Sequence, residues 1–112
     1  MMAGITTHVL DTSRGKPASG VGVTLERRNA KGEWSLVGRG ETDDDGRLRT
    51  LMPEVETGRY RLTFDTGTYF RERHVENFFP EVTIIFEVPD AAQHYHVPLL
   101  LSPFGYSTYR GS

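Results

Sequence analysis

The stretch that decides the fold is HYHVPLLL, from His94 to Leu101, in which two sets of side chains alternate. One set, at positions 95, 97, 99 and 101, consists of tyrosine, valine and leucine and has the character of a hydrophobic core. Successive side chains of a β-strand point to opposite faces, so the stretch predicts a strand with one buried face. The other face carries His94, His96, Pro98 and Leu100, and this set resembles neither a core nor an ordinary solvent-exposed surface.

The same alternation recurs along the chain, between short turn sequences rich in Gly, Pro, Asn and Asp. We expect about eight strands, near residues 5–11, 20–29, 33–42, 47–52, 58–66, 82–88, 93–101 and 105–110. The longest gap, residues 69–80, is the one place where we expect a helix, of one or two turns. Many short strands separated by turns are typical of an all-β protein, and two sheets packed face to face explain the pattern.

Length and composition restrict the function. A chain of 112 residues predicts a single domain, residues 1–112. The net charge of −2 argues against binding to nucleic acid or to an anionic membrane surface, because both need a clear excess of Lys and Arg. The absence of cysteine excludes disulfides, thiolate metal sites and cysteine nucleophiles. We see no secretory signal and no apolar run of the ~18 residues that span a membrane, so we expect a cytoplasmic protein.

The outward face of the first predicted strand is as unusual as that of residues 94–101. Ile5, Thr7 and Val9 share the core face, whereas His8 lies on the other face together with Thr6 and Leu10. Apolar residues on a face that the core does not use are often covered by another copy of the chain. We therefore expect a homo-oligomer whose interface includes these outward faces.

Three of the four histidines fall on these outward faces, namely His8, His94 and His96. Imidazole titrates near pH 6.5, so clustered histidines can act as acid and base at neutral pH. The alternative is a metal site, since a His-x-His pair places two ligands on one side of a strand and His8 could be a third. Nothing else in the sequence supplies a metal-ligand signature, and we predict no metal.

Two further segments are candidates for function. Residues 43–46, DDDG, could suggest calcium, but the spacing of a calcium-binding loop fails and a tight turn is the better interpretation. Arg47 follows this turn, and its guanidinium could bind a carbonyl group or an anion through two hydrogen bonds. The C-terminal segment stays strand-like and aromatic, so we expect it to be docked, with Tyr109, Arg110 and Ser112 held in place.

Taken together, these segments resemble the transthyretin superfamily over essentially the whole chain. The opening of that superfamily is similar to HVLD at residues 8–11 followed by GKPA at 15–18. Its final hairpin is similar to LLSPFGYST at residues 100–108, and its middle to GRY at 58–60 and FPEV at 79–82. The resemblance implies an all-β, transthyretin-like sandwich of two four-stranded sheets with at most one short helix.

Two signatures resemble the enzyme branch of the superfamily, the 5-hydroxyisourate hydrolases, and not its hormone carriers. One is the terminal tetrapeptide YRGS at residues 109–112, and the other is the set His8, Arg47 and His96. The resemblance implies a homotetramer, a dimer of dimers, with a central channel and with sites at the dimer–dimer interface. It also implies opening of the ring of 5-hydroxyisourate by water, as a step of urate breakdown, without a cofactor.

We assign roles to these residues as a hypothesis. His8, Arg47, His96 and Ser112 are the expected catalytic residues, and His8, Arg47 and Tyr109 are expected to bind the substrate. The sequence leaves open which histidine is the base and which the acid, and what His94 does. Two alternatives are a non-catalytic carrier of small aromatic ligands in the same channel and a plain β-sandwich interaction module.

Overall fold

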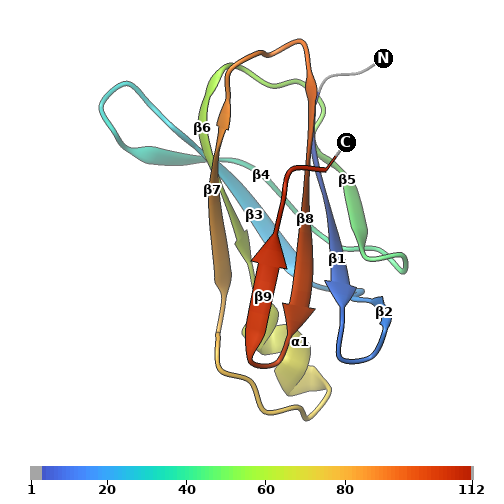
Figure 1. Ribbon diagram of the computed structural model, residues 1–112. Coiled ribbons are helices and arrows are strands. Elements are labelled where there is room, and N and C mark those ends of the chain that lie inside the picture. Colours follow the sequence, from blue (N-terminus) through green and yellow to red (C-terminus); the bar gives the residue numbers. More distant parts are fainter. Residues whose placement is uncertain (1–3, 112) are drawn as a thin grey trace.

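The computed structural model describes residues 4–111, which form two β-sheets packed face to face with one helix at an end (Figure 1). The first sheet contains β1 (Gly4–Asp11), β2 (Lys16–Pro17), β5 (Arg47–Met52), β8 (His94–Ser102) and β9 (Gly105–Thr108). The second contains β4 (Trp34–Glu41), β3 (Gly22–Arg28), β6 (Gly58–Phe64) and β7 (Val82–Val88), in that order. The predicted all-β sandwich is confirmed, with the two-residue β2 as an addition to the eight expected strands.

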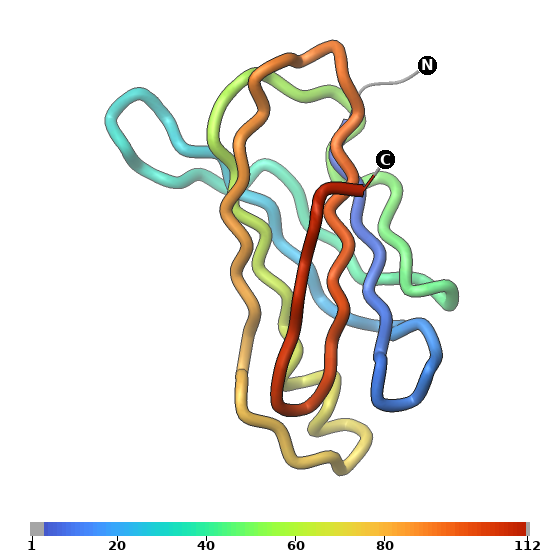
Figure 2. Tube along the Cα trace, viewed as in Figure 1, coloured from blue at the N-terminus to red at the C-terminus, as the bar shows by residue number. Residues whose placement is uncertain are grey.

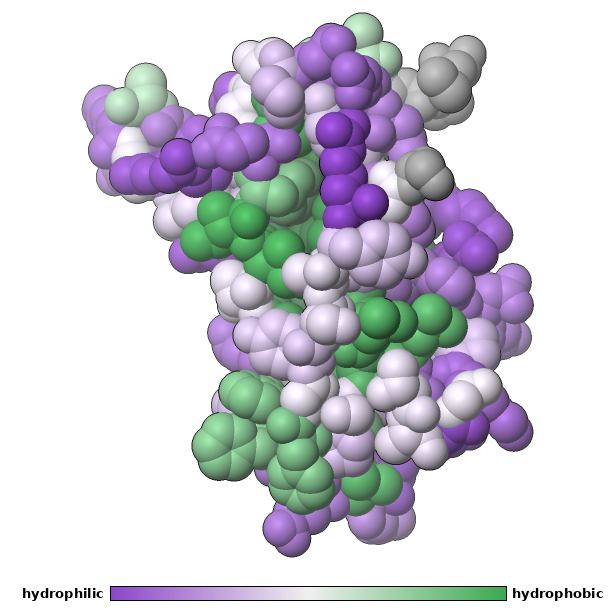
Figure 3. Space-filling model, in the orientation of Figure 1, coloured by the Kyte–Doolittle hydropathy of each residue, from purple (hydrophilic) through white to green (hydrophobic). Residues whose placement is uncertain are grey.

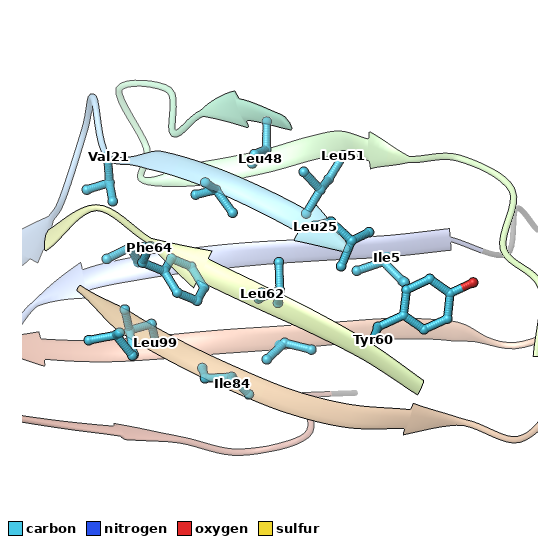
Figure 4. Packing of buried hydrophobic residues seen from close by; sticks show 14 of the residues in the cluster. Ile5, Val21, Leu25, Leu48, Leu51, Tyr60, Leu62, Phe64, Ile84 and Leu99 are labelled. Carbon is cyan, nitrogen blue, oxygen red and sulfur yellow. The ribbon is translucent and has the colours of Figure 1, made fainter. Parts of the chain in front are cut away.

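Strand β1 lies at the centre of the first sheet. It pairs with β8 on one side in parallel, and with β2 and β5 on the other side in antiparallel orientation. The alternation of the sequence places the core between the sheets. Figure 4 shows side chains of both sheets, such as Ile5, Leu99, Leu25 and Leu62, pointing into the space between them, where all four are fully buried.

The helix begins earlier than the sequence predicts. Helix α1 (Thr66–Glu72) starts inside the segment expected to be a strand, and it ends before the middle of the gap at residues 69–80. The reason is the carboxylate of Asp65, which accepts a hydrogen bond of 3.2 Å from the backbone N–H of Thr68 and so caps the helix. The strand expected at residues 58–66 ends at Phe64 in the structure. The helix is too short to cross a membrane, and the described chain forms no other helix.

A buried carboxylate ties this helix to the end of β1. The Asp11 side chain, 1% exposed, accepts a 2.7 Å hydrogen bond from the hydroxyl group of Tyr69 on α1. Its other oxygen accepts hydrogen bonds from the backbone N–H and hydroxyl of Ser13. Burial, and next the hydrogen bond to Asp11, raise the pKa of Tyr69, so its hydroxyl stays a proton donor throughout the physiological range.

We expect Tyr69→Phe to lower the free energy of unfolding by about 1.5–3 kcal/mol, because the buried carboxylate of Asp11 loses a donor. Urea unfolding at one fixed protein concentration measures the loss. The control is Tyr106→Phe, since Tyr106 is 43% exposed and its ring packs against Phe79 without needing the hydroxyl. Equal stability of Tyr69→Phe and the wild type would contradict the assigned role of this hydrogen bond.

The C-terminal segment returns to the first sheet beyond β9. Figure 2 shows it running back beside β8, where the N–H of Gly111 donates a 2.8 Å hydrogen bond to the carbonyl oxygen of His96. Arg110 donates to the side chain of Gln93 at 2.8 Å and lies over the ring of Tyr95. The expected docking of the chain end is therefore confirmed for Arg110. Ser112 lies outside the described residues.

Candidate functional site

Three strands of the first sheet bring three of the five expected site residues together on its outer face. In the antiparallel register of β1 and β5, His8 lies opposite Arg47. In the parallel register of β1 and β8, the residue opposite His96 is Thr6, two positions before His8. The intervening residues Thr7 and Leu48 are buried on the inner face, as the alternation predicts. His8, Arg47 and His96 therefore share one surface although they are far apart in sequence.

A tight turn fixes the start of β5 and with it the position of Arg47. The carboxylate of Asp43 accepts hydrogen bonds of 2.9 Å from the backbone N–H groups of Asp45 and Arg47. Gly46 adopts φ 74°, and a side chain at this position would overlap the carbonyl oxygen of Val9. These contacts confirm the turn at residues 43–46. Among residues 4–111, no group of three or more His, Asp or Glu side chains is arranged to hold a metal ion.

The outer face holds an open groove of about 500 Å³ beside His94 and His96. The groove extends over β1, β5 and β8 and is lined by Gly4, Thr6, Thr7, Arg47, Arg49, Thr50, Met52, Pro53, His94 and His96. Its charged lining is cationic, because it contains two arginines and no carboxylate. Such a lining suits a flat, anionic molecule rich in carbonyl groups.

Both candidate histidines, His8 and His96, have a pKa below the ordinary value for histidine, which favours the neutral imidazole at neutral pH. Burial, and next the positive charge of Arg47, lower the pKa of His96, and the neighbouring His8 and His94 act in the same direction. The same two leading causes lower the pKa of His8, against a hydrogen bond to the backbone of Asp45. A neutral imidazole has a free nitrogen lone pair and can take a proton from water at neutral pH. The site is therefore suited to general base catalysis.

Tyr109 does not face this groove. It is 57% exposed and lines a separate pocket of about 260 Å³, which lies between β7 and β8 and shares only His96 with the groove. Within one chain, Arg47 therefore lies on the groove side of His96, whereas Tyr109 lies on the side of the separate pocket. Tyr109 and Ser112 stay predictions as site residues.

Three residues of this site were missed in the sequence. Thr6 lies within hydrogen-bonding distance of both His94 and His96. Arg49 lines the groove and pairs with Asp43 at 3.6 Å. Gly111 lies so close to His96 that a Cβ atom would come within 2.6 Å of its ring. Thr6 and Arg49 share a strand face with His8 and Arg47, a spacing of two residues that could have indicated them.

Comparison with known proteins identifies the family of this chain. The family model described as the HIUase/Transthyretin family matches residues 5–111. The chain belongs to this family. Within the HIUase/Transthyretin family, it is 48% identical over 110 residues to the 5-hydroxyisourate hydrolase of Salmonella dublin, with 96% of this chain and 80% of the relative covered.

Solved structures of the family include both an enzyme and a hormone-bound protein. The structure of Klebsiella pneumoniae 5-hydroxyisourate hydrolase matches with a TM-score of 0.84 at 35% identity, covering 98% of this chain and 94% of the other. The crystal structure of sea bream transthyretin in complex with thyroxine matches with a TM-score of 0.91 at 32% identity, covering 96% and 93%. The fold alone therefore does not separate the two functions, and the residues of the site must.

Proposed function

We propose that this protein is a 5-hydroxyisourate hydrolase. The observation that carries the proposal is the placement of His8, Arg47 and His96 on one outer face, beside a groove whose charged residues are all cationic. The near-half identity to a curated hydrolase of that name supports it. The reaction opens the six-membered ring at a ring amide and yields 2-oxo-4-hydroxy-4-carboxy-5-ureidoimidazoline. It belongs to urate catabolism.

The reaction makes three demands that these side chains meet. A water molecule must lose a proton, and the neutral imidazoles of His96 and His8 are the groups to take it. The attacked carbonyl oxygen gains negative charge, which the guanidinium of Arg47 stabilises. The leaving ring nitrogen must then receive a proton, which a protonated imidazole returns. These steps need no cofactor.

The same proposal includes a homotetramer, a dimer of dimers with sites at the dimer–dimer interface. The groove is open on a single chain, and the outer face around it includes the half-buried apolar side chains of Leu10 and Leu100. The strands β7 and β9 are edge strands of their sheets. On β7, the side chain of Ile85 is 56% exposed. Figure 3 shows hydrophobic patches on this side of the molecule, among hydrophilic residues. A second copy that covers these surfaces would close the groove and complete it with Tyr109 and Ser112.

The alternative is a carrier of small aromatic ligands, which the structural match to thyroxine-bound transthyretin favours. The lining of the groove speaks against it, because Arg47, Arg49 and two imidazoles would lose hydration without gaining partners from a hydrophobic ligand.

Absorbance decay of freshly generated 5-hydroxyisourate, with and without the protein, tests the proposal. We expect acceleration far above spontaneous decay, and decay at the spontaneous rate would refute the hydrolase. Tight binding of an iodinated aromatic compound without turnover would support the carrier. Light scattering tests the tetramer, which a monomer would refute. The cytoplasmic location stays a prediction that cell fractionation tests.

We expect kcat/KM to fall on the acid side with a midpoint below pH 6.5, the ordinary value for histidine. Protonation removes the lone pair that accepts the proton of water, and both imidazoles have a lowered pKa, so activity persists to lower pH than for an unperturbed histidine. Initial rates across the pH range, each corrected for spontaneous decay at the same pH, measure the midpoint. A midpoint at or above 6.5 would contradict neutral His8 and His96 as the bases.

A further inference from the structure

The hydroxyl group of Thr6 lies between the two histidines of β8. Its oxygen is 2.8 Å from Nδ1 of His96 and 2.9 Å from Nε2 of His94. Both are ordinary hydrogen-bond lengths, and all three side chains are half-buried. The parallel register of β1 and β8 sets this arrangement, because Thr6 lies directly opposite His96 and diagonally opposite His94.

A hydroxyl group has one proton to donate, so it can donate to only one of the two rings and must accept from the other. When Thr6 accepts the Nδ1–H of His96, it donates to Nε2 of His94, and Nε2 of His96 then carries a free lone pair. When Thr6 donates to Nδ1 of His96, that ring carries its proton on Nε2 instead. With its proton on Nδ1, His96 can act as a base through Nε2, and with its proton on Nε2 it can act as an acid. Because Thr6 donates to His94 in the first state and accepts from it in the second, the state of His96 is linked to the protonation of His94.

No other side chain in the described chain offers His96 this link. Its ring makes no other side-chain hydrogen bond among residues 4–111, and no carboxylate lines the groove to fix its tautomer. The charged and titratable groups that face it are Arg47 from β5, His8 from β1 and His94 from its own strand. The branched side chain of Thr6 has restricted rotation on a strand, which holds the hydroxyl between the rings.

We propose that Thr6 is a positioning residue that sets the tautomer of His96 and connects it to His94, which stores a proton during the reaction. This inference rests on the proposed hydrolase function. Water gives a proton to Nε2 of His96 as its oxygen bonds to the substrate carbonyl carbon. The Nδ1 proton of His96 passes to Thr6, and the Thr6 proton passes to Nε2 of His94. His96 is then neutral with a proton on Nε2, and His94 is an imidazolium.

The second half of the reaction reverses the relay. The ring C–N bond breaks as His96 donates its Nε2 proton to the leaving nitrogen. The extra proton of His94 returns through Thr6 to Nδ1 of His96, so both imidazoles end neutral and as they began. The only net change is the addition of one water molecule across the amide bond. His96 thus serves as base and acid in turn.

Replacement of Thr6 by valine tests the link, because valine keeps the shape and loses the hydroxyl. We expect Thr6→Val to lower kcat about tenfold with KM little changed, the effect of one lost hydrogen bond in the transition state. Thr6→Ser restores the hydroxyl and should restore most of kcat. The matched control is Thr24→Val, a half-buried threonine on β3 of the other sheet. Wild-type kcat for Thr6→Val, or no recovery in Thr6→Ser, would overturn the proposal.

The relay also predicts that the two partners depend on each other. His94→Gln should lower kcat by a factor similar to that of Thr6→Val. The kcat of the double variant, with both Thr6→Val and His94→Gln, should be no lower than that of either single variant. Independent contributions would multiply to about a hundredfold, since separate effects on the free energy add. A loss of kcat in the double variant that equals the product of the two single losses would overturn the relay.

Nitrogen NMR of labelled histidine gives a measurement that does not depend on turnover. We expect the His96 ring of the ligand-free wild type to carry its proton on Nδ1, in Thr6→Ser as well, and to shift toward Nε2 in Thr6→Val. An unchanged tautomer in Thr6→Val would overturn the positioning role. If the tautomer shifts as expected but the wild type does not turn over 5-hydroxyisourate, the hydrolase function fails and the hydrogen-bond link stands.

Discussion

His96→Asn is expected to lower kcat/KM for 5-hydroxyisourate by about 10²–10⁴-fold, the usual contribution of a positioned acid or base. Burial, and next the charge of Arg47, lower the pKa of this imidazole, which favours its neutral form at neutral pH. It lines the groove, and it is also the one residue that the groove shares with the pocket of Tyr109. Asparagine keeps a polar group beside Thr6, whereas its amide cannot take a proton from water.

The control for this variant is His74→Asn, which changes the one histidine outside the outer face. His74 is exposed, follows helix α1 and adopts φ 58°, a conformation that asparagine tolerates well. We expect wild-type activity from it. Stopped-flow absorbance at several substrate concentrations separates kcat from KM, and circular dichroism with light scattering checks fold and assembly. A His96→Asn protein that is folded, assembled and within tenfold of wild type would refute the role of His96.

The sequence is sufficient to predict which side chains lie on the core face and which on the outer face of each strand, because side-chain alternation is a local property. The core at residues 95, 97, 99 and 101 and the outward placement of His8 and His96 were predicted in this way, and the structure confirms both. The start of the helix was not predicted correctly. Asp65 is equally suited to a turn and to a helix cap, and only the path of the chain after it decides between them.

The link through Thr6 could not be predicted for a different reason. Thr6 and its two partners are 88 and 90 residues apart, and only the parallel pairing of β1 with β8 brings them together. No local pattern states which strands pair or in which register. The same limit applies to Tyr109, whose position relative to the groove depends on how a second chain packs against the first.

Arg47→Ala is expected to lower kcat/KM by about 10²–10³-fold, the usual effect of removing one donor to a developing oxyanion. Two further consequences follow from its place opposite His8. Loss of the positive charge removes the second cause of the lowered pKa of His96, so the acid-side midpoint of the remaining activity should move upward toward pH 6.5. Arg39→Ala is the control, since Arg39 is exposed on β4 of the other sheet.

Arg47→Lys separates the charge of this residue from its shape. Lysine keeps the positive charge that holds the imidazoles neutral, but it cannot offer two parallel N–H groups to a carbonyl-rich substrate. We therefore expect the acid-side midpoint to stay where the wild type has it, while kcat/KM remains far below wild type. If Arg47→Lys had both the midpoint and the kcat/KM of the wild type, Arg47 would act only through its charge. An upward shift of the midpoint in Arg47→Lys as large as that in Arg47→Ala would show that its charge does not govern His96, because the charge is present in one variant and absent from the other.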